Sequence, residues 1–284
     1  MKQLQWFPGH MAKARRIIEE KLPLVDVVIE LLDARIPLSS RNPMINEIIK
    51  NKPKLIILNK SDLADEKATK EWVEYLKKES YTISVSSLDM NNLDTIILKA
   101  SKEILKEKLL NDQKKGLKNK AIRIMVVGIP NVGKSTFINK LAKRSALITG
   151  DKPGVTKQMQ YVKISDELEL LDNPGILWPK FENENVAYNL ALIGSIKDQI
   201  IPIDDVAIYG IKKINKYYPQ VLMERYGAKY SEDILETYDA IGRRMGLLLP
   251  KNQIDYDKVS IVFLYDLRHK KLGRLTFERV DENV

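Results

Sequence analysis

The feature that most constrains this chain is the octapeptide GIPNVGKS at residues 128–135, which matches the phosphate-loop pattern G-x-x-x-x-G-K-[ST]. The apolar run IRIMVVG at 122–128 predicts a buried strand before it, and KSTFINKLAKR predicts a helix after it. Backbone N–H groups at such a helix N-terminus point at bound phosphate oxygens. We therefore expect an α/β protein with this loop at the carboxyl end of a strand.

Each position of this loop has a chemical role. The glycines let the backbone close around phosphate oxygens, and the serine hydroxyl is a ligand for Mg²⁺. Lys134 reaches the β- and γ-phosphates and is also a predicted catalytic residue. The predicted nucleotide-binding residues of the loop are Gly128, Asn131, Val132, Gly133, Lys134, Ser135 and Thr136.

A second motif, NKSD at residues 59–62, ends another apolar run, KLIILNK at 54–60. Open α/β sheets bind ligands at the carboxyl ends of their strands, so Asn59 and Asp62 are predicted to face a ligand. The Asp62 carboxylate can accept hydrogen bonds from guanine N1 and N2, which adenine cannot offer. A wrong base would therefore cost on the order of 2–5 kcal/mol. The aliphatic stem of Lys60 is predicted to lie along the base.

The segment SVSS at 84–87 ends the next predicted strand. It can place a backbone N–H near guanine O6, so Ser86 and Ser87 belong to the predicted nucleotide site. An ordinary strand-to-helix turn explains these two serines equally well.

Two loops beyond the phosphate loop contain predicted metal ligands. DNPG at 172–175 ends the last predicted strand, where Asp172 suits an outer-shell role at Mg²⁺ and the Gly175 N–H can sense a γ-phosphate. PGVT at 153–156 places Thr156 where it could complete the metal shell only with GTP bound. The predicted Mg²⁺ ligands are Ser135, Thr156 and Asp172.

The order of these motifs is that of a guanine-nucleotide domain whose chain has been cut and rejoined. An ordinary GTPase begins with its phosphate loop, whereas here the base-reading tetrapeptide comes first. A parallel sheet tolerates this change, because linking the old termini and opening another loop keeps the strand packing. The helix and Lys-rich connector at about 93–121 supply the link. We predict a circularly permuted P-loop GTPase domain with a mainly parallel sheet at 1–180, followed by a smaller all-helical domain at 181–284.

Composition limits the classes of partner and site. The absence of cysteine excludes disulfides and thiolate metal sites. The net charge of +9 favours a polyanionic partner, and acid-free basic stretches lie in an N-terminal arm at 10–16, at 114–123 and at 267–274. Any one stretch is equally well a solvated surface, but together they favour RNA or DNA. No apolar run is long enough to span a bilayer, so we expect a cytoplasmic protein without a membrane partner. We also expect a monomer.

The chain resembles the circularly permuted GTPases of ribosome assembly essentially from end to end. The resemblance rests on WFPGHMAKARR, DARIPLSSRNP, NKSD, GIPNVGKST, PGVT, LLDNPGILWPK and the terminal GRLTFE. It implies binding of GTP and GDP, and GTP hydrolysis during late maturation of a large ribosomal subunit precursor, stimulated by that particle. It also implies that the C-terminal helical domain contacts rRNA.

One departure from familiar GTPases bears on mechanism. Ile176 follows DNPG, where many GTPases have a glutamine that orients the attacking water. The resemblance implies that role for His10, although an RNA-contacting arm explains its segment equally well. It also implies a K⁺ ligand at Asn131. Arg35 and Arg41 in DARIPLSSR stay unassigned or act only as braces of that loop.

Two other functions are compatible with the sequence. One is a GTP-sensing, RNA-binding checkpoint that turns over too slowly for hydrolysis to matter. The other is a tRNA-modification or translation GTPase. An ATPase is disfavoured by Asn59 and Asp62.

Overall fold

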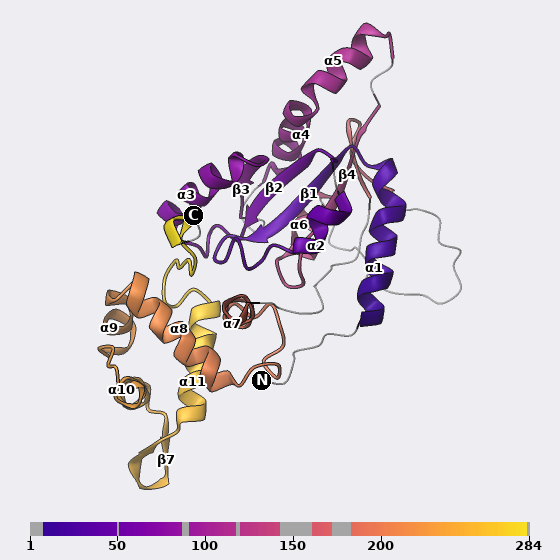
Figure 1. The fold of residues 1–284 in the computed structure, drawn as a ribbon. Helices are drawn as coiled ribbons and strands as arrows, with labels where there is room; N and C mark the ends of the chain where they lie inside the picture. The colour runs from indigo at the N-terminus through magenta and orange to yellow at the C-terminus, as the bar shows by residue number, and fades with distance from the viewer. Residues whose placement is uncertain are drawn as a thin grey trace.

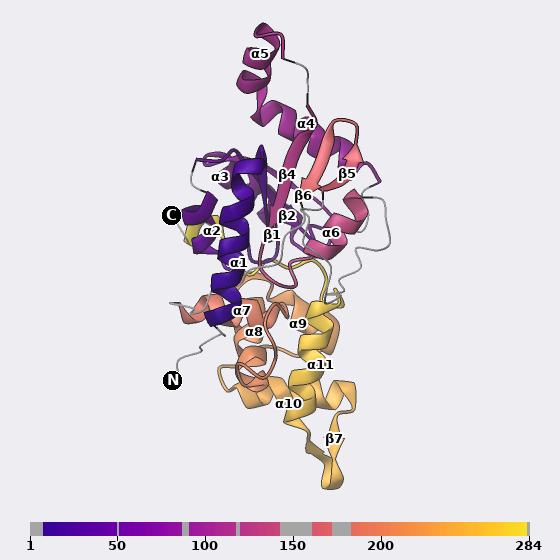
Figure 2. The same ribbon diagram turned by 90° about the vertical axis from the view of Figure 1, so that its right-hand side faces the viewer.

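The computed structural model of the protein describes residues 8–49, 51–86, 91–117, 120–142, 161–171 and 183–282, and at 8–14 and 161 it describes the backbone alone. Figure 1 shows a twisted sheet covered by helices and, at one end of it, a group of helices from residue 183 onward. Figure 2, turned by 90°, shows the same division. The first part is α/β and the second is mainly helical, as the sequence predicted.

The strands of the large sheet are β1 (Val27–Asp33), β2 (Lys54–Asn59), β3 (Tyr81–Ser84), β4 (Ile122–Val127), β5 (Tyr161–Ser165) and β6 (Leu168–Leu171). Their order in the sheet is β3-β2-β1-β4-β6-β5. All neighbouring pairs are parallel except β5 with β6. Every position of β1 is buried, as expected for an apolar strand covered on both faces. The mainly parallel sheet is confirmed.

Helices cover both faces of this sheet. On one face lie α4 (Leu93–Ile104) and α6 (Lys134–Leu141), and on the other lie α1 (Pro8–Lys21), α2 (Pro43–Ile49) and α3 (Glu66–Lys77). Side chains alternate along a strand, so Ile29 and Leu31 of β1 pack toward α4 and α6. Val28 packs with α1 and α2, while Leu32 packs with α3. The sheet is therefore the middle of three layers.

The connector that links β3 to β4 consists of two helices rather than the single long one that the sequence predicted. The chain breaks at Leu105 (φ −95°, ψ 9°), between α4 and α5 (Lys106–Lys114). Leu105 is buried, whereas α5 buries no residue and projects away from the sheet (Figure 1). Most side chains of α5 are charged or polar, so its contacts with the rest of the domain are few. Leu109 is partly buried against the core, and Lys108 pairs with Asp26 at 2.6 Å.

The helical region contains α7 (Glu184–Leu192), α8 (Ile203–Tyr217), α9 (Gln220–Tyr226), α10 (Ile234–Met245) and α11 (Tyr256–Arg268). Its helices pack closely at Gly210 of α8, where a Cβ atom would lie 2.6 Å from Leu192 and 2.9 Å from Phe263. A short antiparallel ribbon of β7 (Leu248–Leu249) and β8 (Gln253–Ile254) interrupts the predicted all-helical pattern. Among the described residues, no helix has both the length and the hydropathy to cross a bilayer.

After α11 the chain returns to the sheet (Figure 1). The indole Nε1 of Trp72 in α3 donates to the carbonyl of Glu278 at 3.1 Å, and the N–H of Phe277 donates to the carbonyl of Arg35 at 2.8 Å. The buried Glu278 carboxylate accepts hydrogen bonds from the backbone N–H groups of Leu38 and Ser39. The C-terminal segment thus fastens the helical region to the loop that follows β1.

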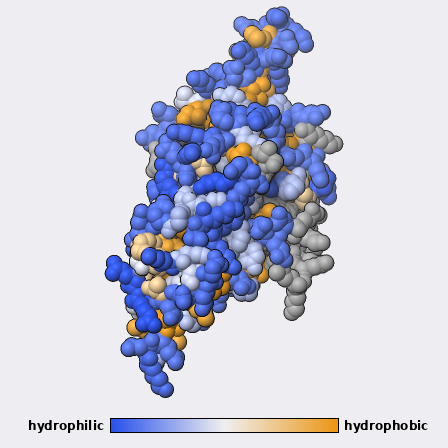
Figure 3. All heavy atoms as spheres, turned by 60° about the vertical axis from the view of Figure 1, so that its left-hand side comes forward, coloured by the Kyte–Doolittle hydropathy of each residue, from blue (hydrophilic) through white to orange (hydrophobic). Residues whose placement is uncertain are grey.

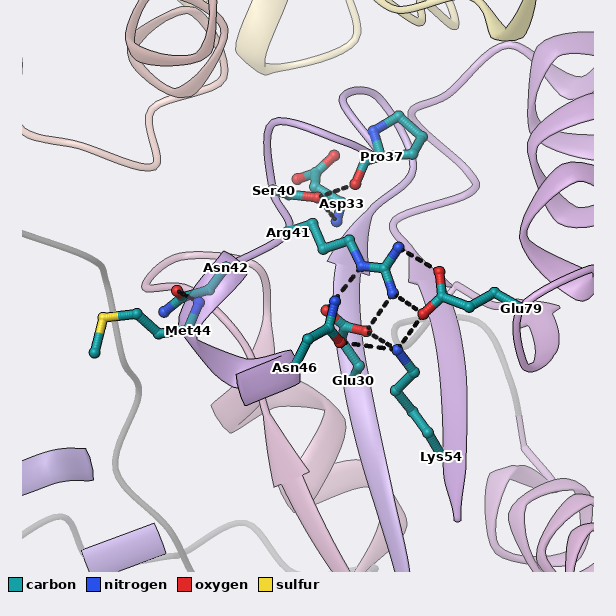
Figure 4. A network of polar contacts seen from close by, with 10 residues as sticks. All are labelled: Glu30, Asp33, Pro37, Ser40, Arg41, Asn42, Met44, Asn46, Lys54 and Glu79. Atoms are coloured by element: carbon teal, nitrogen blue, oxygen red, sulfur yellow. Dashed lines mark hydrogen bonds and ion pairs between the residues drawn. The ribbon is translucent and has the colours of Figure 1, made fainter. Parts of the chain in front are cut away.

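The loop after β1 is braced by a charged network drawn in Figure 4. The guanidinium of Arg41 pairs with Glu30 at 3.3 Å and with Glu79, and the ammonium of Lys54 pairs with Glu30 at 3.3 Å and Glu79 at 2.6 Å. Glu30 is fully buried within β1, and the positive charges of Arg41 and Lys54 offset the cost of burying its carboxylate. Arg41 therefore has the bracing role that the sequence left open.

This network predicts an acid-sensitive contribution to stability from Glu79. Chiefly through its hydrogen bond from Arg41, the pKa of Glu79 is lowered from 4.5 to about 2. Ionised Glu79 therefore stabilises the fold above pH 4.5, and this contribution is lost as the pH falls toward 2. Because the side chain is 45% exposed and screened by solvent, we expect Glu79→Gln to lower the free energy of unfolding at pH 7 by about 1 kcal/mol.

Urea unfolding at pH 7, 4.5 and 3 measures this effect. The difference between Glu79→Gln and the wild type should shrink toward pH 3. Glu74→Gln is the control, since Glu74 lies in α3 and its carboxylate pairs with the exposed Lys77 at 2.6 Å. A Glu79 variant whose stability deficit stays constant across these pH values would contradict the assignment.

Candidate nucleotide-binding site

The phosphate-loop motif joins β4 to α6, in the strand–turn–helix context that the sequence predicted. Two glycines are required by close approach. A Cβ at Gly128 would lie 2.7 Å from the carbonyl oxygen of Leu31, and one at Gly133 would lie 2.5 Å from the side-chain nitrogen of Asn59. Gly133 also has φ of +93°, a conformation that favours glycine. Because neither glycine has a side chain, the N-terminus of α6 stays accessible to an anion.

The NKSD motif lies directly against this loop. The Nδ2 of Asn59 donates to the carbonyl of Val132 at 2.9 Å, and the Nζ of Lys60 donates to the carbonyl of Asn131 at 2.6 Å. Asn59 is buried at the end of β2, where the parallel sheet brings β2 and β4 to the same edge on either side of β1. The two motifs therefore form one continuous surface, although the earlier one precedes the phosphate loop in the chain.

The ammonium group of Lys60 has one partner in the phosphate loop and another in β1. Its Nζ lies 3.1 Å from Oδ2 of Asp33, the last residue of β1, which also forms a two-point contact with Arg35 at 2.8 and 2.9 Å. Burial opposes ionisation of Asp33, but the charges of Arg35 and Lys60 and the hydrogen bonds from Arg35 outweigh it and lower its pKa. With its ammonium fixed in this way, Lys60 can offer its aliphatic stem to a flat ring.

Asp33 is a site residue that the sequence analysis missed. It ends the buried strand β1, and the sequence analysis gave it no role. The pairing of Asp33 with Arg35 in the DAR segment was a usable signal, because a buried acid needs a nearby cation. Arg35 accordingly braces Asp33, and this resolves the second of the two arginines that the sequence left unassigned.

Asp62 lies on a turn beyond β2. Lys60 has φ of +58°, which turns the chain away from the strand direction, and the N–H of Leu63 closes the turn on the carbonyl of Lys60 at 2.9 Å. The Asp62 carboxylate is half-buried and has no hydrogen bond or ion pair with any other residue that the structure describes. It is therefore available for the edge of a base.

The SVSS segment runs beside this turn. The N–H of Val85 donates to the carbonyl of Leu58 at 2.8 Å, and the carbonyl of Val85 accepts from the N–H of Ser61 at 3.1 Å. Ser86 is buried at this junction. Ser87 lies outside the described residues.

The first turn of α6 presents the remaining predicted phosphate and metal groups. Lys134 is half-buried, while Ser135 and Thr136 are exposed. The exposed Ser135 hydroxyl beside a helix N-terminus is a hard oxygen donor that fits Mg²⁺ bound with phosphate. Besides Ser87, the predicted residues outside the described part of the chain are Thr156, Asp172 and Gly175, and also the side chain of His10, whose backbone lies in the first turn of α1.

Asn131 ties the phosphate loop to the helical region. Its Nδ2 donates to the carbonyl of Gly194, just beyond α7, at 3.1 Å, and its own backbone lies at φ +59°. The side chain of Arg268 caps the same end of α7, donating to the carbonyls of Ala191 at 2.7 Å and Leu192 at 3.2 Å. Nothing in the sequence pointed to this connection between the loop and α7.

Comparison with known proteins agrees with this geometry. Residues 123–235 match the family described as "50S ribosome-binding GTPase". The chain is 53% identical to ribosome biogenesis GTPase A of Bacillus cereus, over 98% of this chain and 95% of that protein. The protein of the same name from Thermotoga maritima is 32% identical, over 98% of this chain and 95% of its own length.

Solved structures show the same fold. The GDP-bound structure of TM YlqF superposes with a TM-score of 0.67 at 28% identity, covering 94% of this chain and all of that one. The GNP-bound YlqF from T. maritima has a TM-score of 0.65 at 29% identity, covering 94% and 98%. The permuted GTPase fold is thereby confirmed, and identity of this size along nearly the whole chain means that it belongs to the ribosome biogenesis GTPase A family.

Proposed function

We propose that this GTPase binds GTP and GDP at the joined NKSD and phosphate loops, and that it hydrolyses GTP during late assembly of the large ribosomal subunit. The observation that carries the proposal is the direct contact of Asn59 and Lys60 with the phosphate loop. This contact leaves the Asp62 carboxylate at one end of a continuous surface and the N-terminus of α6 at the other. The names of the relatives support the ribosomal setting, and we assign the protein to the cytoplasm.

In this proposal the base and the phosphates bind at opposite ends of the surface. Asp62 accepts hydrogen bonds from guanine N1 and N2, the stem of Lys60 covers the ring, and a backbone N–H near Ser86 and Ser87 meets O6. At the other end, the backbone of the phosphate loop, Lys134 and the Ser135 and Thr136 groups hold the phosphates.

The metal and the hydrolysis step draw on both described and undescribed residues. Ser135 would hold Mg²⁺ together with Thr156 and Asp172, and Gly175 would sense the γ-phosphate. When bound, Mg²⁺ neutralises charge on the β- and γ-phosphates. Lys134 stabilises the charge that develops on the transferred phosphoryl group.

Water activation is proposed to come from outside the phosphate loop. Ile176 cannot orient a water molecule, so we assign that task to His10 once the ribosomal particle has positioned the N-terminal segment. K⁺ at Asn131 would supply further positive charge, and the fixed orientation of the Asn131 amide by Gly194 suits a ligand role for its oxygen.

We assign rRNA contact to the domain at 181–284. The rings of Tyr265 and His269 stack at 4.0 Å on α11, and the ammonium of Lys271 lies 5.1 Å from the Tyr265 ring. Exposed aromatic and cationic groups of this kind suit bases and phosphates. On the face shown in Figure 3, apolar residues form only small separate areas, which is typical of a monomer with a hydrophilic partner.

Substitution of Asp62 tests the base-reading role. Asp62→Asn replaces an acceptor by an amide that can donate to the C2 carbonyl of xanthine. We expect affinity for GDP to fall by at least about tenfold and affinity for xanthosine diphosphate to rise, measured by displacement of a fluorescent nucleotide. Asp239→Asn in the helical region is the control. Unchanged preference for GDP in the Asp62 variant would argue against base reading at this position.

Turnover measurements test the ribosomal role. We expect large-subunit precursors to accelerate GTP hydrolysis by about tenfold or more in K⁺, with less acceleration in Na⁺. His10→Ala should lose most of this stimulation while retaining its affinity for GDP. Precursors that bind but give no acceleration would favour the slow checkpoint, and co-sedimentation with tRNA instead of precursors would favour a tRNA-modification or translation role.

A further inference from the structure

The C-terminal segment lies directly on the turn that carries Asp62. The guanidinium of Arg274 donates through Nε to the carbonyl of Ala64 at 2.7 Å and through Nη2 to the carbonyl of Ser61 at 3.0 Å. One side chain thus bonds the peptide groups on both sides of Asp62. Its third nitrogen lies 3.5 Å from the carboxylate of Glu66 at the start of α3.

The residues after Arg274 continue the same contact. The N–H of Leu275 donates to the carbonyl of Leu63 at 3.0 Å, and the hydroxyl of Thr276 accepts from the N–H of Asp65 at 3.1 Å. From Ser61 to Asp65, therefore, the turn is bonded along its length by a strip of chain that lies more than two hundred residues later. Within the sheet domain, the Ser61 N–H donates to Val85 and the Leu63 N–H donates to Lys60, while Asp65 caps α3.

This strip is itself firmly seated. Leu275, Thr276 and Phe277 are buried, and the N–H of Thr276 donates to the hydroxyl of Tyr218 at 2.9 Å, at the end of α8. The same hydroxyl donates to the carboxylate of Asp65 at 3.1 Å. The backbone at Arg274 is therefore fixed, and its side chain can hold the turn in a defined position.

We propose that Arg274 is a positioning residue for guanine recognition, holding the Ser61–Ala64 turn so that the Asp62 carboxylate meets both N1 and N2 of the base. This inference rests on the proposed nucleotide binding at Asp62. Two hydrogen bonds from one base edge to one carboxylate demand a fixed approach, and selectivity is lost when either is stretched. The turn leaves the strand at Lys60 with positive φ and has no regular secondary structure to hold it.

The planar guanidinium group explains why this position requires an arginine. A guanidinium can bond two carbonyl oxygens at once in a fixed geometry, whereas a lysine ammonium is a single flexible point charge. Arg274 donates two hydrogen bonds to backbone carbonyls, whereas its contact with the Glu66 carboxylate is longer. Its main effect is therefore to fix the conformation of the turn, and the ion pair is secondary.

The test compares GDP with inosine diphosphate, whose base lacks the 2-amino group that Asp62 would read. Competition against a fluorescent guanine nucleotide gives the affinity ratio of the two for each variant. We expect a ratio of at least about tenfold in the wild type, from the loss of one hydrogen bond to a charged group. Arg274→Ala should bring the ratio close to one, chiefly by weakening GDP, and Arg274→Lys should fall between.

Arg225→Ala is the matched control. Arg225 is a half-exposed arginine of the helical region that pairs with buried Asp266 at 2.8 Å, away from the turn, and its removal should leave the ratio unchanged. Thermal unfolding monitors whether each variant is folded, and Arg274→Lys supplies the comparison if the alanine variant is not. A folded Arg274 variant with the wild-type ratio would overturn the inference, while a wild type that binds GDP and inosine diphosphate equally would overturn base reading at Asp62 itself.

Discussion

The hydrogen bond from the Asn59 amide to the carbonyl of Val132 is the contact on which the rest of the site depends. It joins the end of β2 to the loop after β4 across the intervening β1, and it needs Gly133 because any side chain there would strike the same amide. Lys60 reinforces it by bridging Asp33 and the carbonyl of Asn131. The NKSD motif and the phosphate-loop motif thus form one continuous surface, whatever their order in the chain.

Circular permutation changes what surrounds that surface. The NKSD motif now precedes the phosphate loop, and its turn is bonded by Arg274 and Leu275 of the C-terminal segment. The phosphate loop in turn touches the helical region through Asn131 and Gly194. The rearranged order therefore gives the helical region a contact at each end of the candidate nucleotide site.

Much of this fold could be predicted from local sequence patterns, whereas the remainder depends on contacts between distant parts of the chain. An apolar run such as IRIMVVG predicts a buried strand, and GIPNVGKS predicts the turn and helix that follow it, because the physical reasons lie within a few residues. The partners of Asp33 and Arg274 come from other elements, so their roles depend on tertiary geometry. The break at Leu105 was missed for a related reason: apolar residues at helical spacing continue through it, so a local pattern does not reveal where α4 ends and α5 begins.

The two contacts from the helical region have a thermodynamic consequence. Gly194 bonds the phosphate loop and Arg274 bonds the turn of Asp62, so both ends of the candidate site are shaped by parts of the chain beyond residue 183. Coupling between binding events is reciprocal: a partner that shifts these parts must change nucleotide affinity by the same factor by which nucleotide changes partner affinity. With contacts at base and phosphate alike, such a shift would act on GDP as well as on GTP. A partner that preserved the Gly194 contact and released only Arg274 would instead weaken guanine selectivity without altering the phosphate loop.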